Sequence, residues 1–352
     1  MKILFRADGN AKIGSGHVMR CLAIADCASE SSDSECVFVS ADRELSGIIE
    51  RHGYVDIVMD TEYDSMEGET EKFQNILSKE KPDVIFIDSY FVTKKYLSDV
   101  YKFCVDSGIR LIYIDDMLYF AYPCDMVLNY GIFAETLKSA YQEIYTRAGI
   151  GNPRLLLGIR FAPLRSEFRS SFGRVTRKSG KDILVTTGGA DNYHILIGMI
   201  DEIIRRGEEK HVFHLIIGSH NPDSQMIKEK ASAHENICVY EKVNCMSRIM
   251  TKCDVAISAS GSTLFELCAT QTPSVIYTVA DNQKSGAVGF SDRGLMEYCG
   301  DARDYDSKRI ASLLLDKAAM LADDYEKRMR VSYAMRELVD GRGACRIINE
   351  MS

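Results

Sequence analysis

The segment Ile13-Gly14-Ser15-Gly16-His17 combines two glycines with an imidazole at an expected strand-to-helix junction. Lys2 to Ala7 is short and apolar and predicts a strand, and apolar residues repeat at helical spacing from Val18 to Ala25. Glycines let a ligand approach backbone N–H groups, and the start of a helix attracts negative charge and disfavours an imidazolium. A neutral imidazole can accept a proton, so the segment predicts a general base at His17.

The same pattern also fits a purely structural role, in which Gly14 and Gly16 form a tight turn and the histidine caps or packs the helix. Two nucleotide-binding motifs are excluded. Gly9 and Gly14 have the spacing of a Walker loop, but Ser15-Gly16 stands where Lys-Ser/Thr is required. The segment also lacks the third glycine of a dinucleotide-binding fingerprint, because Met19 occupies that position.

Composition narrows the class of protein. A chain of 352 residues is long for one core and favours two domains of roughly 150 to 180 residues. Its 43 basic and 51 acidic residues give a net charge of -8, which argues against an extended surface for nucleic acid or anionic membranes. The 11 cysteines include no C-x-x-C pair, and no apolar run reaches signal-peptide or transmembrane length. These features predict a cytoplasmic protein with reduced thiols.

The first half alternates strands and helices. Asp83 to Asp88 and Arg110 to Asp115 are continuous apolar runs, typical of parallel strands that are covered on both faces. The carboxyl ends of such strands meet at one rim, where ligands collect. We therefore expect the His17 loop to share this rim with Asp88-Ser89-Tyr90, Asp115-Asp116 and Asn129-Tyr130-Gly131. The rim acids could hold a metal, but acids at strand ends commonly cap turns, so we predict turn caps at Asp115 and Asp116 and no metal.

The second half repeats this architecture after a basic stretch that contains Gly and Ser. Asp182 to Thr187 predicts a strand that leads to Gly188-Gly189-Ala190-Asp191. Asp254 to Ala259 predicts another, which leads to Ser260-Gly261-Ser262-Thr263 and a helix bearing Glu266. Backbone amides and hydroxyls suit phosphate oxygens, and a carboxylate one turn later can accept hydrogen bonds from a ribose. The alternative is that Ser262 or Thr263 caps the helix and Glu266 is a surface acid.

Several segments together resemble a known family over nearly the whole chain. They are RADGNAKIGSGHVMRCLAIA, IDSY, IDDM, LNYG, LLLGIRFAPLRSEF, GGAD, SASGSTLFE and VDGRGACRI, in this order. They resemble the UDP-sugar hydrolases of pseudaminic acid biosynthesis and their spore-coat polysaccharide relatives. Each piece alone is weak evidence, but their joint occurrence is specific.

The resemblance implies the GT-B fold, with two Rossmann-like parallel-sheet domains that face a central cleft. We expect an N-terminal domain at residues 1–170, a linker at 171–181, a UDP-binding domain at 182–330 and a helical tail at 331–352 that packs back on the first domain. The implied reaction is metal-independent and needs no cofactor. Water displaces UDP from UDP-2,4-diacetamido-2,4,6-trideoxy-β-L-altropyranose with inversion at the anomeric carbon.

The resemblance also implies roles for individual residues. His17 activates the water, Gly188 and Gly189 lie near the diphosphate, Ser260 to Thr263 bind the phosphates and Glu266 binds the ribose. The expected UDP-binding set is completed by Asp191, Asn282 and Gln283. The expected sugar-side set is Gly14, Ser15, Gly16, Asp88, Tyr90 and Asn129, where Asp88 could equally be a hydrogen-bonding partner of His17.

Two other functions remain open from the sequence. One is a GT-B glycosyltransferase that uses a UDP-amino sugar in surface or spore-coat polysaccharide synthesis, with His17 as the base for an acceptor hydroxyl. The other is a non-catalytic protein that binds a nucleotide sugar. The expected partner in all three cases is a small UDP-sugar and not a nucleic acid or a membrane. The sequence leaves the oligomeric state open, and a monomer is compatible with it.

Overall fold

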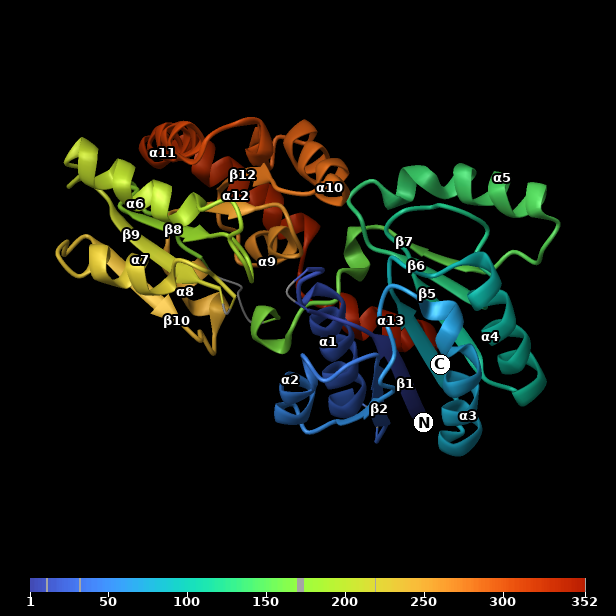
Figure 1. The fold of residues 1–352 in the computed structure, drawn as a ribbon. Coiled ribbons are helices and arrows are strands. Elements are labelled where there is room, and N and C mark those ends of the chain that lie inside the picture. The colour runs from blue at the N-terminus through green and yellow to red at the C-terminus, as the bar shows by residue number, and fades with distance from the viewer. Residues whose placement is uncertain (11, 32, 170–173, 219, 352) are drawn as a thin grey trace. The chain divides into compact units, whose positions relative to one another are not determined.

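The structure is a computed structural model that describes residues 1–10, 12–31, 33–169, 174–218 and 220–351. The chain forms two compact units, Met1–Ser166 with Arg342–Ser352 and Glu167–Gly341 (Figure 1). Each unit contains one parallel β-sheet with helices connecting its strands. The predicted α/β class is therefore confirmed.

The sheet of the first unit has the strand order β3-β2-β1-β4-β5-β6-β7, and all neighbouring strands run parallel. The strands are β1 Lys2–Ala7, β2 Glu35–Ser40, β3 Val55–Val58, β4 Val84–Asp88, β5 Arg110–Ile114, β6 Met126–Asn129 and β7 Arg154–Leu157. The ring of Phe5 stacks between those of Phe38 and Phe86, with ring centroids 5.0 Å apart in both pairs. This aromatic row ties β1 to its two neighbours.

In the described part of the first unit, six α-helices pack around this sheet. They are α1 Gly16–Ser31, α2 Ser46–Arg51, α3 Thr70–Glu80, α4 Lys94–Ser107, α5 Lys138–Ala148 and α13 Gly343–Met351. The helices α3, α4 and α5 contribute Phe73, Leu97 and Tyr141 to one hydrophobic core. The helix α1 packs against β1, β2 and β4, and α13 packs against α1. Because β4 is buried along its whole length, its neighbours cover both of its faces.

The sheet of the second unit has the order β10-β9-β8-β11-β12-β13 and is also parallel. Its strands are β8 Asp182–Thr186, β9 Val212–Ile217, β10 Ile237–Glu241, β11 Val255–Ala259, β12 Ser274–Thr278 and β13 Met296–Asp301. Its helices are α6 Ile195–Arg206, α7 Ser224–Ala231, α8 Met246–Lys252, α9 Thr263–Ala269, α10 Asp281–Asp292, α11 Ser307–Asp323 and α12 Tyr325–Leu338. The helices α6 and α11 pack on each other over a core that includes Val185 and Ile257.

The boundaries of the two units differ from the expected domain limits. Of the predicted linker, residues 171–173 lie outside the described residues, and the remainder packs on the second unit. Arg174 donates to Thr272 Oγ1 at 2.8 Å, and Arg177 donates through Nε to Asp254 Oδ1 at 2.8 Å. The predicted tail at residues 331–352 is divided between the units. The end of α12 belongs to the second unit, and α13 belongs to the first.

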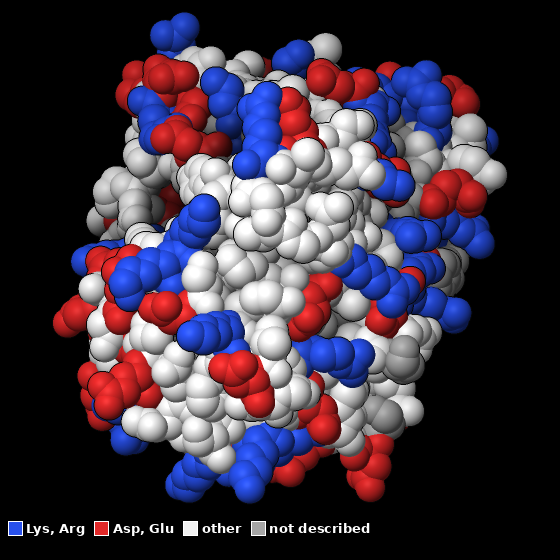
Figure 2. Space-filling view, turned by 90° about the vertical axis from the view of Figure 1, so that its right-hand side faces the viewer, with Lys and Arg blue, Asp and Glu red and all other residues white. Residues whose placement is uncertain are grey.

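Charged side chains of both signs are interspersed on the face of the molecule that Figure 2 shows. None of the helices in the described part of the chain has both the length and the apolar character that a membrane span needs.

A buried ion network joins β1 to the segment before α3. Arg6 and Glu69 are both 0% exposed, and the guanidinium donates from Nε to Oε1 and from Nη2 to Oε2, each at 2.7 Å. Its Nη1 donates to Asp8 Oδ2 at 2.6 Å, and Asp8 Oδ1 accepts from the backbone N–H of Ala41 at 2.7 Å. These bonds fix the point where the chain leaves β1 towards the His17 loop.

Glu69→Ala should therefore destabilise the first unit strongly, because it leaves Arg6 buried without its bidentate partner. A loss of about 3–5 kcal/mol is typical when one member of a buried pair is removed. Hydrogen exchange of β1 peptides, followed by mass spectrometry, measures this loss in the first unit.

Glu143→Ala is the matched control, since Glu143 is an exposed residue of α5 that pairs with Arg147. We expect a change within about 0.5 kcal/mol there. Equal effects of the two substitutions on β1 exchange would contradict the role assigned to the Arg6 network.

Candidate active site

The first candidate site lies where the strand order of the first sheet reverses. The strands β1 and β4 are neighbours there, and their register pairs Ala7 with Asp88. The chain continues from β1 through the glycine loop into α1, which begins at Gly16 and carries His17 in its first turn. The carboxyl ends of two strands that diverge in topology leave a crevice in such sheets. The fold therefore brings His17 and Asp88, which are 71 residues apart, together at this point.

His17 and Asp88 form a buried pair. The Nδ1 atom of His17 lies 2.6 Å from Oδ1 of Asp88, and the two side chains are 4% and 0% exposed. A carboxylate at this distance accepts a proton from Nδ1, so we assign the Nδ1–H tautomer and a lone pair on Nε2. Within the described part of the chain, no hydrogen bond reaches Nε2. An imidazole held in this way can act as a base through Nε2.

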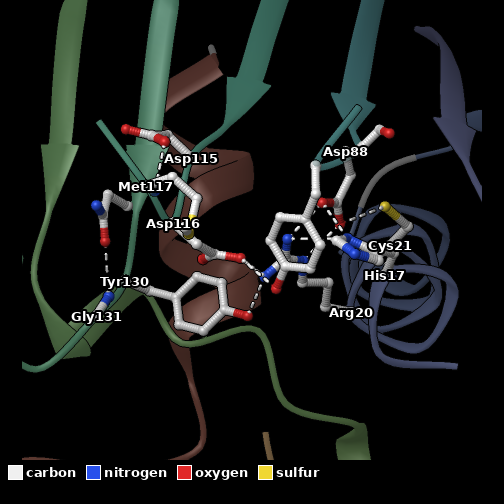
Figure 3. A network of polar contacts seen from close by, with 12 residues as sticks. His17, Arg20, Cys21, Asp88, Asp115, Asp116, Met117, Tyr130 and Gly131 are labelled. Carbon is white, nitrogen blue, oxygen red and sulfur yellow. Dashed lines mark hydrogen bonds and ion pairs between the residues drawn. The ribbon is translucent and has the colours of Figure 1, made fainter. Parts of the chain in front are cut away.

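Arg20 holds the other side of the Asp88 carboxylate (Figure 3). Its Nε donates to Oδ2 at 2.5 Å, and its Nη2 donates to Oδ1, the same oxygen that contacts His17. Burial alone would raise the pKa of Asp88. The positive charge of Arg20 and the contact with His17 outweigh this effect and hold the pKa below its usual range. Asp88 is therefore ionised at neutral pH.

Arg20 also links this pair to the next two strand ends. Its Nη1 donates to Oδ2 of Asp116, which follows β5, at 2.8 Å. It also donates to the hydroxyl of Tyr130, which follows β6, at 2.6 Å. Tyr90 closes the arrangement, because its ring meets the ring of His17 edge-on at a centroid distance of 4.4 Å. The hydroxyl of Tyr90 donates to the same Asp116 oxygen at 3.2 Å. One guanidinium thus organises the ends of three strands.

Arg20 was not predicted from the sequence, and Asp116 and Tyr130 were expected at the rim but not as site residues. Asp116 was expected to cap a turn and instead pairs with Arg20, so that prediction was wrong. A signal was present at Arg20, which follows His17 by three residues and therefore lies on the same face of α1. A guanidinium on a buried helix face needs a carboxylate partner, but the sequence does not identify which one.

The glycine loop is a tight turn. Asn10 and Gly14 exchange backbone hydrogen bonds of 3.2 and 2.7 Å, and the Asn10 side chain accepts from the N–H of Ile13 at 3.0 Å. Gly14 has a φ of 74°, which a side chain would strain. At Gly16 an added Cβ would meet open space, and Ser15 is partly exposed. The turn expected on structural grounds is therefore present, and it presents the first turn of α1.

Two expected sugar-binding residues are engaged within the protein. Asp88 is enclosed behind His17, which fits its alternative role as the partner of the imidazole. The amide of Asn129 donates to the Tyr141 hydroxyl at 3.0 Å and accepts from the N–H of Gly131 at 2.9 Å. Both ends of the amide are thus occupied within the protein, and the side chain is 4% exposed. Direct sugar contact by these two residues stays a prediction.

Asp115 is a turn cap, as expected. Its carboxylate accepts from the backbone N–H groups of Met117 and Leu118, at 2.8 and 3.0 Å, and from the Tyr122 hydroxyl. In the described ranges, no three His, Cys, Asp or Glu side chains are grouped so as to hold a metal ion.

The second candidate site lies where the strand order of the second sheet reverses. The neighbours there are β8 and β11, so the loops that begin at Gly188 and at Ser260 start side by side. Gly188 has a φ of 84°, and both Gly188 and Gly189 are exposed. The next strand approaches this loop closely, because a Cβ added to Gly218 would lie 2.2 Å from the Gly188 carbonyl oxygen. These contacts hold the two exposed glycines at the strand end.

The buried Ser260 hydroxyl has no hydrogen-bond partner among the described residues, and neither has that of Thr187 at the end of β8. Gly261 and Ser262 are exposed, Thr263 is partly exposed, and α9 begins at Thr263 and carries Glu266 within its first turn. Buried hydroxyls without a partner are costly unless a ligand or water satisfies them. This end of the second sheet therefore has unused hydrogen-bonding capacity.

Three other expected UDP-binding residues lie at the starts of helices. Asp191 accepts from the N–H groups of Ile195 and Leu196, at 3.0 and 2.8 Å, and so caps α6. Burial raises the pKa of this carboxyl, although the two N–H groups oppose the shift. Asn282 and Gln283 lie in the first turn of α10, where Gln283 accepts from the N–H of Val279 at 2.9 Å. Asp191 and Gln283 thus have structural partners in addition to any role towards a ligand.

Known proteins share this architecture. Residues 183–338 match the model of the glycosyltransferase family 28 C-terminal domain. The crystal structure of MurG from Acinetobacter baumannii superposes on this chain with a TM-score of 0.64 at 11% sequence identity. The match covers 99% of this chain and 98% of the MurG chain. The chain has the GT-B fold. The structure of the UDP-GlcNAc 2-epimerase of Neisseria meningitidis, solved with bound UDP-GlcNAc, matches this chain with a TM-score of 0.63 at 13% sequence identity. The match covers 100% of this chain and 99% of the epimerase chain.

Sequence relatives of this GT-B chain are distant. The UDP-2,4-diacetamido-2,4,6-trideoxy-β-L-altropyranose hydrolase of Campylobacter jejuni is 22% identical over 84% of this chain and 97% of its own length. The spore coat polysaccharide biosynthesis protein SpsG of Bacillus subtilis is 23% identical over 97% and 95%. An uncharacterized protein of Methanocaldococcus jannaschii is 24% identical over 78% of this chain, which spans 55% of that protein. The resemblance expected from the motifs is confirmed.

Asp88→Asn should show the charge of this carboxylate as a pH-dependent loss of stability. The folded protein holds the Asp88 pKa below the unfolded value of about 3.9, so ionised Asp88 stabilises the fold above that pH. We expect the free energy of unfolding of the wild type to exceed that of the variant most near neutral pH. This difference should narrow by about 1.4 kcal/mol per pH unit below about pH 4.

Urea unfolding between about pH 2 and 7 measures this difference in the free energy of unfolding. Asp99→Asn is the control, because Asp99 is an exposed residue of α4 that pairs with Lys95, and its effect should stay small at every pH. A wild-type advantage over Asp88→Asn that does not change with pH would contradict the assignment of a buried, ionised Asp88.

Proposed function

We propose that this chain is a nucleotide-sugar enzyme, and specifically an inverting hydrolase that releases UDP from UDP-2,4-diacetamido-2,4,6-trideoxy-β-L-altropyranose. The observation that carries the proposal is the buried Asp88–His17 pair at the reversal of the first sheet. The 22% identical hydrolase of C. jejuni, which this chain matches over 97% of its length, supports the choice of substrate.

In the proposed reaction, His17 Nε2 takes a proton from a water molecule whose oxygen forms a bond to the anomeric carbon. The bond from that carbon to the phosphate oxygen breaks, and its electron pair leaves with UDP. Asp88 holds the Nδ1–H group at 2.6 Å and stabilises the imidazolium that forms. Tyr90 restrains the ring by its edge-on contact. Such a base typically contributes about 10²–10⁴ to the rate.

The second unit is proposed to bind UDP. Gly188 and Gly189 offer exposed backbone at the end of β8, and the segment from Ser260 to Thr263 offers hydroxyls and amides at the end of β11. The unpartnered Ser260 hydroxyl supports this role, because a phosphate oxygen would satisfy it. Glu266 is proposed to accept hydrogen bonds from the ribose. The match of residues 183–338 to the glycosyltransferase family 28 C-terminal domain is consistent with a UDP-binding role of the second unit.

A glycosyltransferase that uses a UDP-amino sugar is the second candidate. The match to a glycosyltransferase domain and the full-length similarity to the spore-coat protein favour it. The two candidates use the same base and differ in the nucleophile, which is water in one and an acceptor hydroxyl in the other.

Incubation of the purified protein with this UDP-sugar and no acceptor tests the proposal. We expect UDP release by the wild type and release at least about 100-fold slower by His17→Gln, with unchanged UDP affinity, because only the proton acceptor is lost. His52→Gln is the control, since His52 pairs with Asp26 at the surface of the first unit. Chromatography of UDP measures all three rates.

Release only after an acceptor is added would favour the transferase. UDP-sugar binding without turnover under either condition would favour a non-catalytic binding protein. Equal rates in wild type and His17→Gln would remove His17 from the role of base.

Glu266→Ala should weaken UDP binding by about 1.5–3 kcal/mol, the usual value of a hydrogen bond to a charged group. Isothermal titration calorimetry with UDP measures the change. Glu229→Ala, on the exposed side of α7 in the same unit, is the control and should bind UDP like the wild type. An unchanged affinity in Glu266→Ala would support the alternative that Glu266 is a surface acid.

A further inference from the structure

The Arg20 guanidinium lies beside the proposed base. Its Nη2 is 3.1 Å from His17 Nδ1, and both atoms contact Oδ1 of Asp88. Because Nδ1 carries the proton that Asp88 accepts, the two N–H groups share one acceptor and do not bond to each other. The Arg20 side chain is 8% exposed, so little solvent screens its charge from the imidazole.

Arg20 is the positively charged group of the network around the His17 ring. Burial raises the pKa of the Cys21 thiol, which lies 3.7 Å from Asp88 Oδ2, and burial also raises that of the Tyr130 hydroxyl, so both are neutral. Tyr90 contacts the ring by its edge. Among the described residues, the charged groups of this network are Asp88 and Asp116, which are negative, and Arg20, which pairs with both.

We propose that Arg20 is a positioning residue that keeps His17 unprotonated and turned for proton transfer. Its bidentate hold on Asp88 aims Oδ1 at Nδ1 of His17, which leaves the lone pair on Nε2. Its charge opposes formation of a second positive charge on the adjacent ring. The consequence for catalysis rests on the proposed function, but the effect on the imidazole itself does not.

The sign of the effect follows from these charges. Without Arg20, the negative charge of Asp88 would act on His17 with no compensating charge beside it, and the ring would keep its proton to higher pH. A smaller fraction of the base would then be available at neutral and acidic pH. The acidic limb of the pH profile of kcat/KM would move to higher pH, which a merely structural role of Arg20 would not cause.

¹⁵N NMR of the His17 ring, recorded between about pH 4 and 9, tests the proposal without any substrate. We expect the Nδ1–H tautomer in the wild type. In Arg20→Gln the midpoint of the His17 titration should rise, because the positive charge beside the ring is lost. In Arg20→Lys, which retains the charge but loses the bidentate fork, the midpoint should stay near that of the wild type and Nδ1–H should be less dominant.

Turnover of the same variants gives an independent readout. With the UDP-sugar, Arg20→Gln should lower kcat/KM at pH values below the wild-type midpoint by up to about tenfold, and activity should recover as the pH rises above the raised midpoint. Arg20→Lys should lower kcat at every pH, because the ring is less well oriented.

A folded Arg20→Gln protein with an unshifted His17 midpoint would overturn the proposal. If that variant does not fold, the double variant Arg20→Gln with Asp116→Asn replaces it, because it leaves one fewer unpaired carboxylate. The His17 midpoint of the double variant should then exceed that of Asp116→Asn alone. Equality of those two midpoints would also overturn it. A shifted midpoint in a protein whose wild type releases no UDP would uphold the role of Arg20 and refute the hydrolase function.

Discussion

The first unit depends on keeping one fully buried carboxylate ionised. Transfer of Asp88 out of water is costly, and the protein offsets this cost with the Arg20 guanidinium and the Nδ1–H group of His17. Both partners come from the first two turns of α1, so the helix must begin directly after the glycine loop. The φ of 74° at Gly14 allows that early start. The base, its orientation and the loop geometry are therefore consequences of a single buried charge.

The same topological feature positions polar groups in both units. In each sheet the strand order reverses beside the first strand, between β1 and β4 and between β8 and β11. Loops that follow such neighbours diverge to opposite faces, which exposes backbone and side chains at the strand ends. In the first unit this point holds a satisfied acid–base network. In the second it holds exposed glycines and two buried hydroxyls that have no hydrogen-bond partner among the described residues.

Local patterns predicted most of the fold. Continuous apolar runs located β1, β4 and β8, because burial on both faces leaves a clear signature, and the helical repeat located α1. The strands β3, β7 and β13 were missed, since they are partly exposed and β13 contains few apolar residues. The site network joins Arg20 to partners 68 to 110 residues away, and no local pattern encodes such pairings. The sequence pointed to His17 through the glycine loop and the helix start that follow β1, and to Asp88 through its place at the end of a predicted strand.

The account turns on water attacking the anomeric carbon under the control of His17. Turnover of UDP-2,4-diacetamido-2,4,6-trideoxy-β-L-altropyranose in ¹⁸O-water, with NMR and mass spectrometry of the first-formed products, tests this claim most directly. The account predicts ¹⁸O at the anomeric carbon of the released sugar, the opposite anomeric configuration from the substrate, and unlabelled UDP. Label in the phosphate of UDP, or a sugar released with retained configuration, would contradict it.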